Sequence, residues 1–360
     1  MAIYIFFSTI SIISFILNLI IVITKKVHIQ FTGDINFGPQ KIHKSQTPRI
    51  GGIGIYMTLI LTLMLLNFFY YDQRDILFGN LLSIIIITLP AIIVGLAEDL
   101  YKDISIFFRF CSSLVVGLIA YFHDVSLSIS NINFIDEHLI FYNLLPFLTI
   151  IFFAGSINSI NLIDGINGLA GLTSIIILIT LSQLAFLNND YNNYYFTFLI
   201  IGTILGFLII NWLTGSIFLG DSGAYLLGAM LAYVACNVLN QNDLSLLNIF
   251  TLFAYPIWEI TNSMIRRLYN NKKITIADNK HLHSFAYIWV SKNFKNKNTS
   301  VKSSLTTLFL LPLITIGPIT TLFFYENPRL LVFSFLMICI FSSLIYAKLN
   351  YKLNLTKKLS

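Results

Sequence analysis

The residues best suited to chemistry are polar side chains that interrupt a chain dominated by Ile, Leu and Phe. In the stretch NSINLIDGINGLAG (158–171), Asn158, Asn161, Asp164 and Asn167 recur at intervals of three. Carboxylate and amide oxygens are the ligands that a hard cation such as Mg²⁺ prefers, and this ion usually completes its octahedron with waters and substrate phosphates. The stretch is therefore a candidate site for a cation.

Four further clusters carry related side chains. They are KIHKSQTPRIGGIGIY (41–56) with Lys44, GLAEDLYKDIS (95–105) with Glu98 and Asp99, FLGDSGAYLLG (218–228) with Asp221, and residues 256–284 with Arg266, Arg267, His281 and His283. Taken singly, each has a structural reading: a basic flank, a solvated loop, or a helix cap at Asp221. The His-x-His pair lacks further nitrogen or sulfur ligands for zinc and suits a phosphate better. Together, the five clusters predict a pyrophosphate or nucleotide substrate.

These clusters must be positioned by membrane helices, because 56% of the 360 residues are hydrophobic and only 11% are charged. A membrane helix needs about 20 mostly apolar residues. The sequence predicts an all-α, polytopic membrane protein, a single integral membrane domain over 1–360 with about eleven transmembrane helices. The predicted spans are 3–24, 51–70, 81–97, 106–122, 139–155, 168–187, 195–212, 222–239, 247–265, 304–325 and 329–347.

The distribution of basic residues predicts the orientation. Twenty of the 22 Lys and Arg residues, all except Arg74 and Arg329, lie on the side that would be cytoplasmic if the N-terminus were outside and the C-terminus cytoplasmic. The cytoplasmic loops expected to form the active site are 25–50, 98–105, 156–167, 213–221 and 266–303. The acids of the clusters lie at the inner ends of helices and not at mid-membrane. This depth argues against the proton relay of a transporter or flippase, which is the alternative class.

The ordered set of motifs from about 40 to 284 resembles the polyprenyl-phosphate N-acetylhexosamine-1-phosphate transferases, glycosyltransferase family 4. The resemblance implies an enzyme of the bacterial inner membrane with its active site on the cytoplasmic face. Such an enzyme transfers a sugar 1-phosphate from a UDP-linked N-acetylated sugar to undecaprenyl phosphate and releases UMP. The product initiates a lipid-linked cell-surface glycan. The resemblance also implies Mg²⁺, with Mn²⁺ as the alternative ion, and no nucleic-acid partner; a homodimer is the assembly considered.

The resemblance implies roles residue by residue. Metal ligands would be Asp221 and Asn161; catalytic acids would be Asp99, which activates the lipid phosphate, with Glu98 and Asp164; substrate contacts would come from Lys44, Asn158, Asn167, Arg266, Arg267, His281 and His283. The sequence departs from the family at Glu98, Asn167 and Glu259, where Asp is usual or frequent, and at Ser284, where a third histidine is frequent.

Two alternatives stay open within the enzyme class. One is a phospho-MurNAc-pentapeptide transferase, although the His-Leu-His form at 281–283 favours the sugar-only group. The other is a two-step route through a phosphorylated aspartate in place of direct attack. The donor sugar is not determined by these motifs.

Overall fold

The fold consists of helices throughout the residues that the computed structural model describes, which are 2–33, 46–69, 74–127, 139–271 and 280–358. Those ranges hold α1 (Ala2–Ile23), α2 (Lys25–Thr32), α3 (Gly51–Phe69), α4 (Arg74–Tyr101), α5 (Ile106–Phe122), α7 (Leu139–Ile163), α8 (Leu169–Leu187), α9 (Tyr191–Thr214), α10 (Gly220–Gln241), α11 (Leu247–Leu252), α12 (Ala254–Tyr269), α13 (Leu282–Asn293), α14 (Thr299–Phe324) and α15 (Pro328–Lys358). An isolated bridge joins Gly33 to Pro48. The predicted all-α class is confirmed.

Nine helices of the described part of the chain are long and apolar enough to cross a membrane: α1, α3, α4, α7, α8, α9, α10, α14 and α15. The apolar helix α5, over the span predicted at 106–122, is shorter than these. The protein is therefore a multi-pass membrane protein, as the sequence predicts. Its orientation in the membrane stays a prediction.

The segment 247–265, predicted as one span, is two helices, α11 and α12, separated at Phe253. Pro256 has no amide hydrogen to donate to the carbonyl four residues earlier, so an unbroken helix would lose a hydrogen bond there. In the structure Pro256 instead lies in the first turn of α12, where a free amide is not needed. After the break, α12 begins at Ala254, and this second helix carries Glu259, Arg266 and Arg267.

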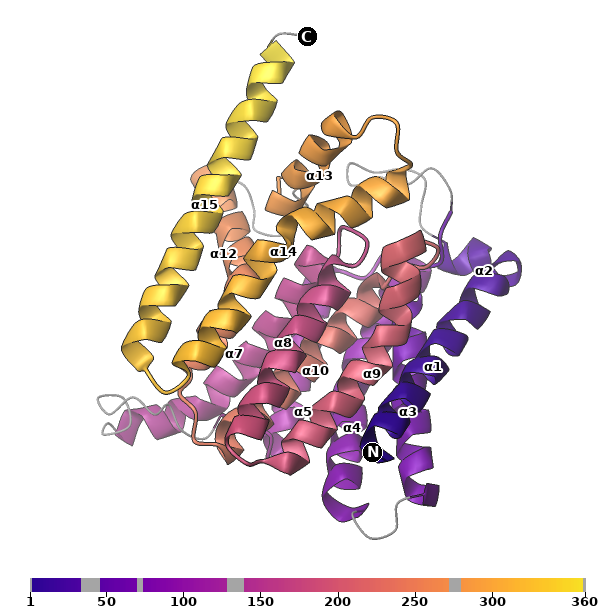
Figure 1. Cartoon of the computed structure of the whole chain (residues 1–360), viewed down its shortest axis with the longest axis vertical. Helices are drawn as coiled ribbons and strands as arrows, with labels where there is room; N and C mark the ends of the chain where they lie inside the picture. Colours follow the sequence, from indigo (N-terminus) through magenta and orange to yellow (C-terminus); the bar gives the residue numbers. More distant parts are fainter. Residues whose placement is uncertain (1, 34–45, 70–73, 128–138, 272–279, 359–360) are drawn as a thin grey trace.

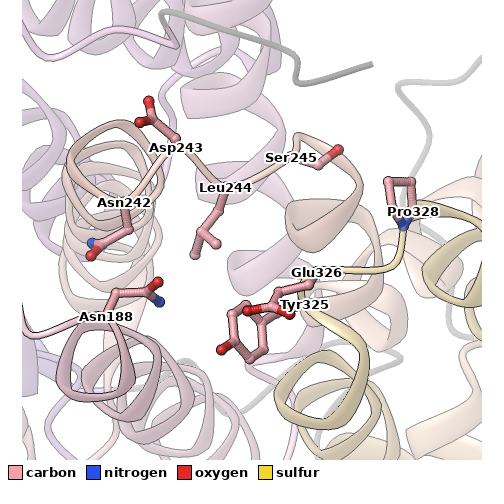
Figure 2. A pocket seen from close by; sticks show the side chains of 8 residues that line it. All are labelled: Asn188, Asn242, Asp243, Leu244, Ser245, Tyr325, Glu326 and Pro328. Carbon is pink, nitrogen blue, oxygen red and sulfur yellow. The ribbon is translucent and has the colours of Figure 1, made fainter. Parts of the chain in front are cut away.

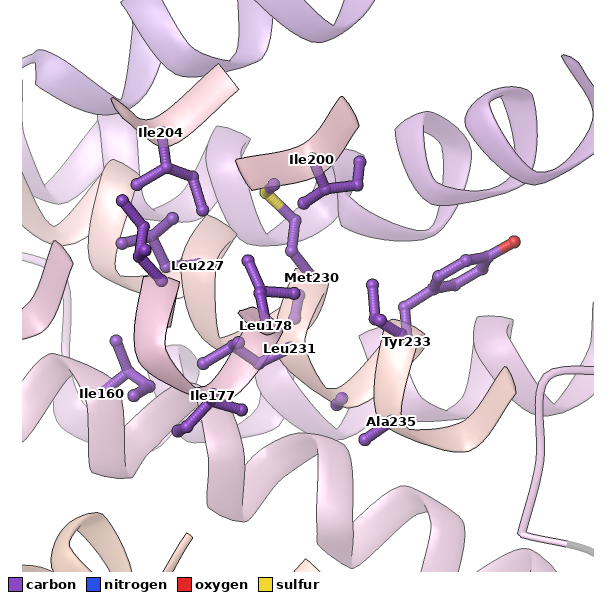
Figure 3. Close-up of a cluster of buried hydrophobic side chains, with 14 of the residues drawn as sticks. Ile160, Ile177, Leu178, Ile200, Ile204, Leu227, Met230, Leu231, Tyr233 and Ala235 are labelled. Atoms are coloured by element: carbon purple, nitrogen blue, oxygen red, sulfur yellow. The ribbon is translucent and has the colours of Figure 1, made fainter. Parts of the chain in front are cut away.

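The core is organised around α10, which packs against α3, α4, α7 and α8. Its residues are buried from Ser222 to Cys236, and Leu227, Met230 and Leu231 meet Ile177 and Leu178 of α8 and Ile200 of α9 (Figure 3). A helix of this length rises about 33 Å, enough to cross the hydrocarbon layer. One end of this central helix therefore lies at each side of the membrane.

The polar motifs gather at one end of the bundle. In Figure 1 the ends of α3, α7, α8, α9 and α14 that carry or flank the motifs lie toward α2 and α13, whereas the N-terminus lies at the other end. Both α4 and α7 continue into segments predicted as loops, to Tyr101 and Ile163. The side chains of these last turns therefore come from rigid helices.

Candidate active site

Asp99 holds the start of α10 from a different helix. Its Oδ1 accepts a hydrogen bond from the backbone N–H of Asp221 (2.8 Å), and its Oδ2 accepts from the backbone N–H (2.9 Å) and Oγ (2.7 Å) of Ser222. The first amides of a helix have no partner within the helix, and a carboxylate is favourable at that end. The side chain is not exposed at all. Asp99 therefore fixes the backbone that carries Asp221.

The segment before α3 lies against the segment before α10. Three backbone hydrogen bonds join them: Phe218 N to Pro48 O (2.8 Å), Gly51 N to Phe218 O (3.0 Å) and Gly52 N to Leu219 O (3.1 Å). A Cβ atom on Gly52 would overlap the backbone of Gly223, so the two helix ends meet without side chains between them. This contact brings Arg49 next to Asp221.

Two arginines bridge three carboxylates in what we call the acid–arginine cluster. Arg49 lies 3.8 Å from Asp99 (Nε to Oδ1) and 3.9 Å from Asp221 (Nη2 to Oδ2). Nη1 of Arg109 lies 3.2 Å from Oε1 of Glu98 and 3.8 Å from Oδ2 of Asp221. Asp221 thus stands between both guanidinium groups, and its side chain is 14% exposed. The cluster combines an accessible carboxylate with cations suited to phosphate oxygens.

Asp164 lies on the loop between α7 and α8, within electrostatic range of this cluster. Burial raises the pKa of the Asp164 carboxyl well above its usual range; Arg49 opposes the rise, while the charges of Asp221 and Asp99 add to it. The end of this loop is attached to α9, because the backbone N–H of Gly168, at φ +81°, donates to Oδ1 of Asn211 (2.7 Å). The loop thus presents a carboxyl group to the other two carboxylates.

The His-x-His pair meets the same loop. Nδ1 of His283 lies 3.2 Å from Oε1 of Glu259, and its Nε2 would lie 2.8 Å from a Cβ atom built on Gly165. The ring of His281 stacks on that of His283, with centroids 5.2 Å apart. Burial acts to raise the pKa of Glu259, but its interactions with the two histidines outweigh burial and hold that pKa below the usual range. The structure therefore brings together motifs that are more than 100 residues apart.

The asparagines of the predicted site occupy different surroundings. Asn158 donates to Oγ of Ser113 in α5 (3.1 Å) and to its own helix, whereas Asn161 is half-buried and its carbonyl accepts the Asp164 amide (3.3 Å). Asn167 is buried against α14: its N–H donates to Oγ of Ser303 (2.8 Å), and its carbonyl accepts from Oγ1 of Thr307 (2.7 Å). Their predicted substrate and metal contacts stay predictions.

Three basic residues are predicted to contact the substrate, and the structure describes two of them, Arg266 and Arg267. Lys44 lies outside the described residues. Arg266 turns toward α15, where its guanidinium lies over the ring of Tyr346 at 5.6 Å and donates to the Tyr346 hydroxyl (3.3 Å); Arg267 follows it in the last turn of α12. The predicted roles of these three residues stay predictions; within the described part of the chain, the cations that pair with Asp221 are Arg49 and Arg109.

The candidate site set did not include Arg49, Arg109 or Glu259, which the structure places beside its acids and histidines. A signal for Arg109 existed, because a single charge within the apolar run IFFRFC is expensive in a membrane helix unless it has a partner or a function. No comparable local signal links Glu259 to the histidines, since their contact depends on the break before α12.

The donor set fits Mg²⁺ better than a metal held entirely by protein. Among the described residues, no group of three or more His, Cys, Asp or Glu side chains is arranged to hold a metal ion. Mg²⁺ usually takes only one or two carboxylates and completes its shell with waters and phosphates. Asp221 and Asp164 supply carboxylate oxygens of the kind that Mg²⁺ binds, and they are close enough to interact electrostatically. These two residues would hold a divalent cation together with waters and phosphate oxygens.

A cavity of about 310 Å³ lies at the other end of the bundle and is separate from these groups. Figure 2 shows Asn188, Asn242 and Tyr325 around it; these residues follow the last turns of α8, α10 and α14. Because α10 begins at the acid–arginine cluster and ends here, the length of the helix separates the two places. The cavity contributes nothing to the candidate active site.

Known proteins with similar sequences are named as sugar 1-phosphate transferases. Residues 81–239 match the sequence profile of glycosyl transferase family 4. The chain is 27% identical over 272 residues to the undecaprenyl-phosphate alpha-N-acetylglucosaminyl 1-phosphate transferase of Thermotoga maritima, covering 75% of this chain and 77% of that protein. It is 26% identical over 279 residues to a probable undecaprenyl-phosphate N-acetylglucosaminyl 1-phosphate transferase of Bacillus subtilis, covering 76% of each.

A second group of relatives carries a different name. The chain is 27% identical over 209 residues to the phospho-N-acetylmuramoyl-pentapeptide-transferase of Streptococcus thermophilus, covering 54% of this chain and 60% of that protein. The profile match spans α4 to α10, which includes Glu98, Asp99, Asp164 and Asp221. From α4 to α10 the chain is therefore similar to members of glycosyl transferase family 4.

Proposed function

We propose that the protein transfers an N-acetylated sugar 1-phosphate from a UDP-sugar to undecaprenyl phosphate, with release of UMP. In this reaction an oxygen of the acceptor phosphate forms a bond to the β-phosphorus of the donor, and the bond between that phosphorus and the oxygen of UMP breaks. The observation that carries the proposal is Asp221, held between Arg49 and Arg109 at one end of a membrane bundle. The names of the relatives from Thermotoga maritima and Bacillus subtilis support it.

We assign the donor diphosphate to the space between Asp221, the Asp164 loop and His283. Phosphoryl transfer depends chiefly on positioning and on charge stabilisation, and both guanidinium groups and histidine rings supply donors to phosphate oxygens. Asp221, Asp164 and Asn161 would hold Mg²⁺, which when bound would neutralise charge on the diphosphate. Lys44, Arg266 and Arg267 remain candidates for further donor contacts.

The two adjacent acids take different roles in this proposal. Both oxygens of Asp99 are occupied by the amides that begin α10, and its side chain is inaccessible. Glu98 is 16% exposed and is held by Arg109 (3.2 Å) and by the backbone N–H of Ile104 (2.9 Å). We therefore assign the contact with the acceptor phosphate to Glu98 and Arg109, and the positioning of Asp221 to Asp99.

The membrane placement follows from the same assignment. A UDP-sugar is a cytoplasmic metabolite class, and the basic residues of the motif-bearing loops favour the cytoplasmic side. We place the site on the cytoplasmic face of a bacterial inner membrane, with the N-terminus outside. This position lets the acceptor reach the cluster from the lipid while the donor arrives from water.

The pentapeptide transferase is the second candidate, because relatives with that name match 54% of this chain or more. The two functions differ in the donor and share the acceptor. Purified protein in undecaprenyl phosphate micelles with Mg²⁺ should therefore be offered a panel of UDP-N-acetylated sugars and UDP-MurNAc-pentapeptide in parallel. A lipid product with equimolar UMP from a sugar donor supports our proposal, and a product from the pentapeptide donor alone supports the second.

Asp221→Asn is the decisive variant, since it keeps the size of the side chain and removes its charge. We expect it to lose at least about 100-fold in transfer, a loss typical of a preorganised electrostatic group. Asp190→Asn is the matched control: Asp190 caps α9 by accepting from Asn193 N (3.1 Å) at the far end of the bundle. Equal activity of Asp221→Asn and the wild type would contradict the proposal.

Incubation with donor alone separates the two chemical routes. Direct attack leaves the enzyme unmodified, whereas a two-step route leaves an aspartate that carries the sugar 1-phosphoryl group and releases one equivalent of UMP before acceptor is added. Mass spectrometry of the intact chain detects the difference.

A further inference from the structure

Glu259 is a fully buried carboxylate, 1% exposed, that binds the start of α13 from the neighbouring helix α12. Its Oε2 accepts from the backbone N–H of Leu282 and its Oε1 from that of His283, both at 3.4 Å. The Tyr255 hydroxyl donates to Oε1 at 3.3 Å. A charge in a site without water is expensive unless such partners surround it. The position is therefore built for an ionised acid.

The same carboxylate fixes the histidine side chains. Nδ1 of His283 lies 3.2 Å from Oε1, and Nδ1 of His281 lies 3.7 Å from Oε2. The two rings are parallel to within 3°. One carboxylate group thus contacts the backbone of the His-x-His pair, forms a hydrogen bond with the ring of His283 and lies near the ring of His281, which links the pair to α12.

The orientation of His283 follows from these contacts. Because Nδ1 faces Glu259, the ring directs Nε2 toward Gly165, where an added Cβ atom would lie 2.8 Å away. A flipped ring would turn carbon toward the carboxylate and lose the hydrogen bond. The residue next to Gly165 is Asp164, so Nε2 is held beside the loop to which we assigned the donor diphosphate.

We propose that Glu259 is a positioning residue that holds His283 in the one orientation in which Nε2 faces a phosphate group of the donor. This inference rests on the proposed function, because it deepens the description of the same site. Glu259 touches no substrate in this arrangement and acts through the ring of His283. Residues that orient a metal-ligating histidine in this way typically change metal affinity or activity by about 10-fold to 100-fold when they are replaced, and we expect an effect near the lower end for a histidine that faces a phosphate.

A double-mutant cycle tests the proposal on the full-length protein. We expect Glu259→Gln to raise the KM for the UDP-sugar about 10-fold, with the KM for undecaprenyl phosphate within about 2-fold of the wild-type value. We expect the same change in His283→Asn, and no additional change when Glu259→Gln is combined with it, since groups that act through one another are not additive. Glu259→Asp, which keeps the charge, should recover part of the loss.

Two controls separate this role from a general loss of stability. Asp190→Asn, at the other end of the bundle, replaces one of two acceptor oxygens by an NH₂ group; because Oδ2 now accepts from the side chains of Asn193 and Asn242, the change should lower the unfolding temperature without changing the donor KM. Gly165→Ala pushes on Nε2 without touching Glu259 and should raise the donor KM, whereas Gly155→Ala, whose Cβ would meet no atom within 4 Å, should not. If Glu259→Gln does not fold, the two glycine variants still test whether the position of Nε2 of His283 affects the donor KM.

The results distinguish failure of the positioning role from failure of the proposed function. Full additivity of Glu259→Gln and His283→Asn, or a normal donor KM in Gly165→Ala, overturns the positioning role while wild-type transfer leaves the proposed function intact. Absence of transfer by the wild-type protein with every UDP-linked donor overturns the proposed function itself. Non-additivity together with a raised donor KM in Gly165→Ala supports both.

Discussion

Replacement of Asp99 by Asn tests how the start of α10 is held. The variant keeps the size of the side chain but exchanges one acceptor oxygen for an NH₂ group. Of the three groups that now donate to Asp99, the Ser222 hydroxyl can rotate and accept from the new amide. The backbone N–H of either Asp221 or Ser222 cannot, so one of these two donors is left without an acceptor.

The magnitude follows from this count. A buried donor without an acceptor costs about 1–3 kcal/mol, and a hydrogen bond to a charged group contributes about 1.5–3 kcal/mol, part of which is lost at the remaining amide. We expect Asp99→Asn to lower the free energy of unfolding by about 3 kcal/mol. If misplacement of Asp221 raised the activation free energy of transfer by the same amount, the transfer rate would fall by roughly 100-fold.

The assay compares Asp99→Asn with Glu98→Gln in purified protein. Thermal unfolding and sugar 1-phosphate transfer are measured on the same samples. Asp99→Asn should lower both the unfolding temperature and the rate, whereas Glu98→Gln should lower the rate with a much smaller change in unfolding temperature, because Glu98 is partly exposed. An Asp99→Asn protein with wild-type unfolding temperature and strongly reduced transfer would refute the capping argument and favour a direct chemical role.

Three further predictions concern the same end of the bundle. Gly52→Ala should destabilise the protein and abolish transfer because its Cβ would overlap the Gly223 backbone, whereas Gly79→Ala, with open space around its Cβ, should leave both unchanged; unfolding and activity assays decide. The pKa of Asp164 is raised from 3.8, so its contribution to stability is fully present below about pH 4 and is lost as the pH rises through the folded-state pKa. Unfolding temperature without Mg²⁺ should therefore fall with pH more steeply in wild type than in Asp164→Asn, and added Mg²⁺ should reduce the difference; identical profiles would contradict the assignment. Asn211→Ala removes the acceptor for the Gly168 amide and should cost about 1–3 kcal/mol of unfolding free energy, measurable by denaturant or thermal unfolding, and a neutral effect would show that the loop does not depend on this bond.

Hydropathy could predict the membrane helices because it depends on each segment alone. The spans over α8, α9 and α10 were predicted to within a few residues at most ends, and the polar motifs were predicted to lie together because they recur at alternate helix ends. The span predicted at 247–265 was wrong as a single helix, since the effect of Pro256 on the backbone overrides average hydropathy. The number and position of most membrane helices could therefore be predicted from local composition.

The internal arrangement of the site could not be predicted in the same way. The sequence pairs Glu98 with Asp99 as equals, but only the packing of α4 against α10 places Asp99 at two backbone amides and leaves Glu98 with Arg109. Likewise, nothing near Asn167 in the sequence indicates Ser303 and Thr307 as its partners. Contacts between residues this far apart in the chain depend on how the helices pack, which spacing and composition do not specify.

The attachment of Asn167 to α14 has a consequence for any attempt to define a minimal active fragment. The motifs end at residue 284, so a protein shortened to that residue would retain every residue to which we assign chemistry. Such a protein would lack the Ser303 hydroxyl, which accepts from the backbone N–H of Asn167, and the Thr307 hydroxyl, which donates to the Asn167 carbonyl, three residues after Asp164. We expect a protein shortened in this way to regain support for the Asp164 loop only when α14 is supplied, for example by residues 299–360 expressed as a separate polypeptide.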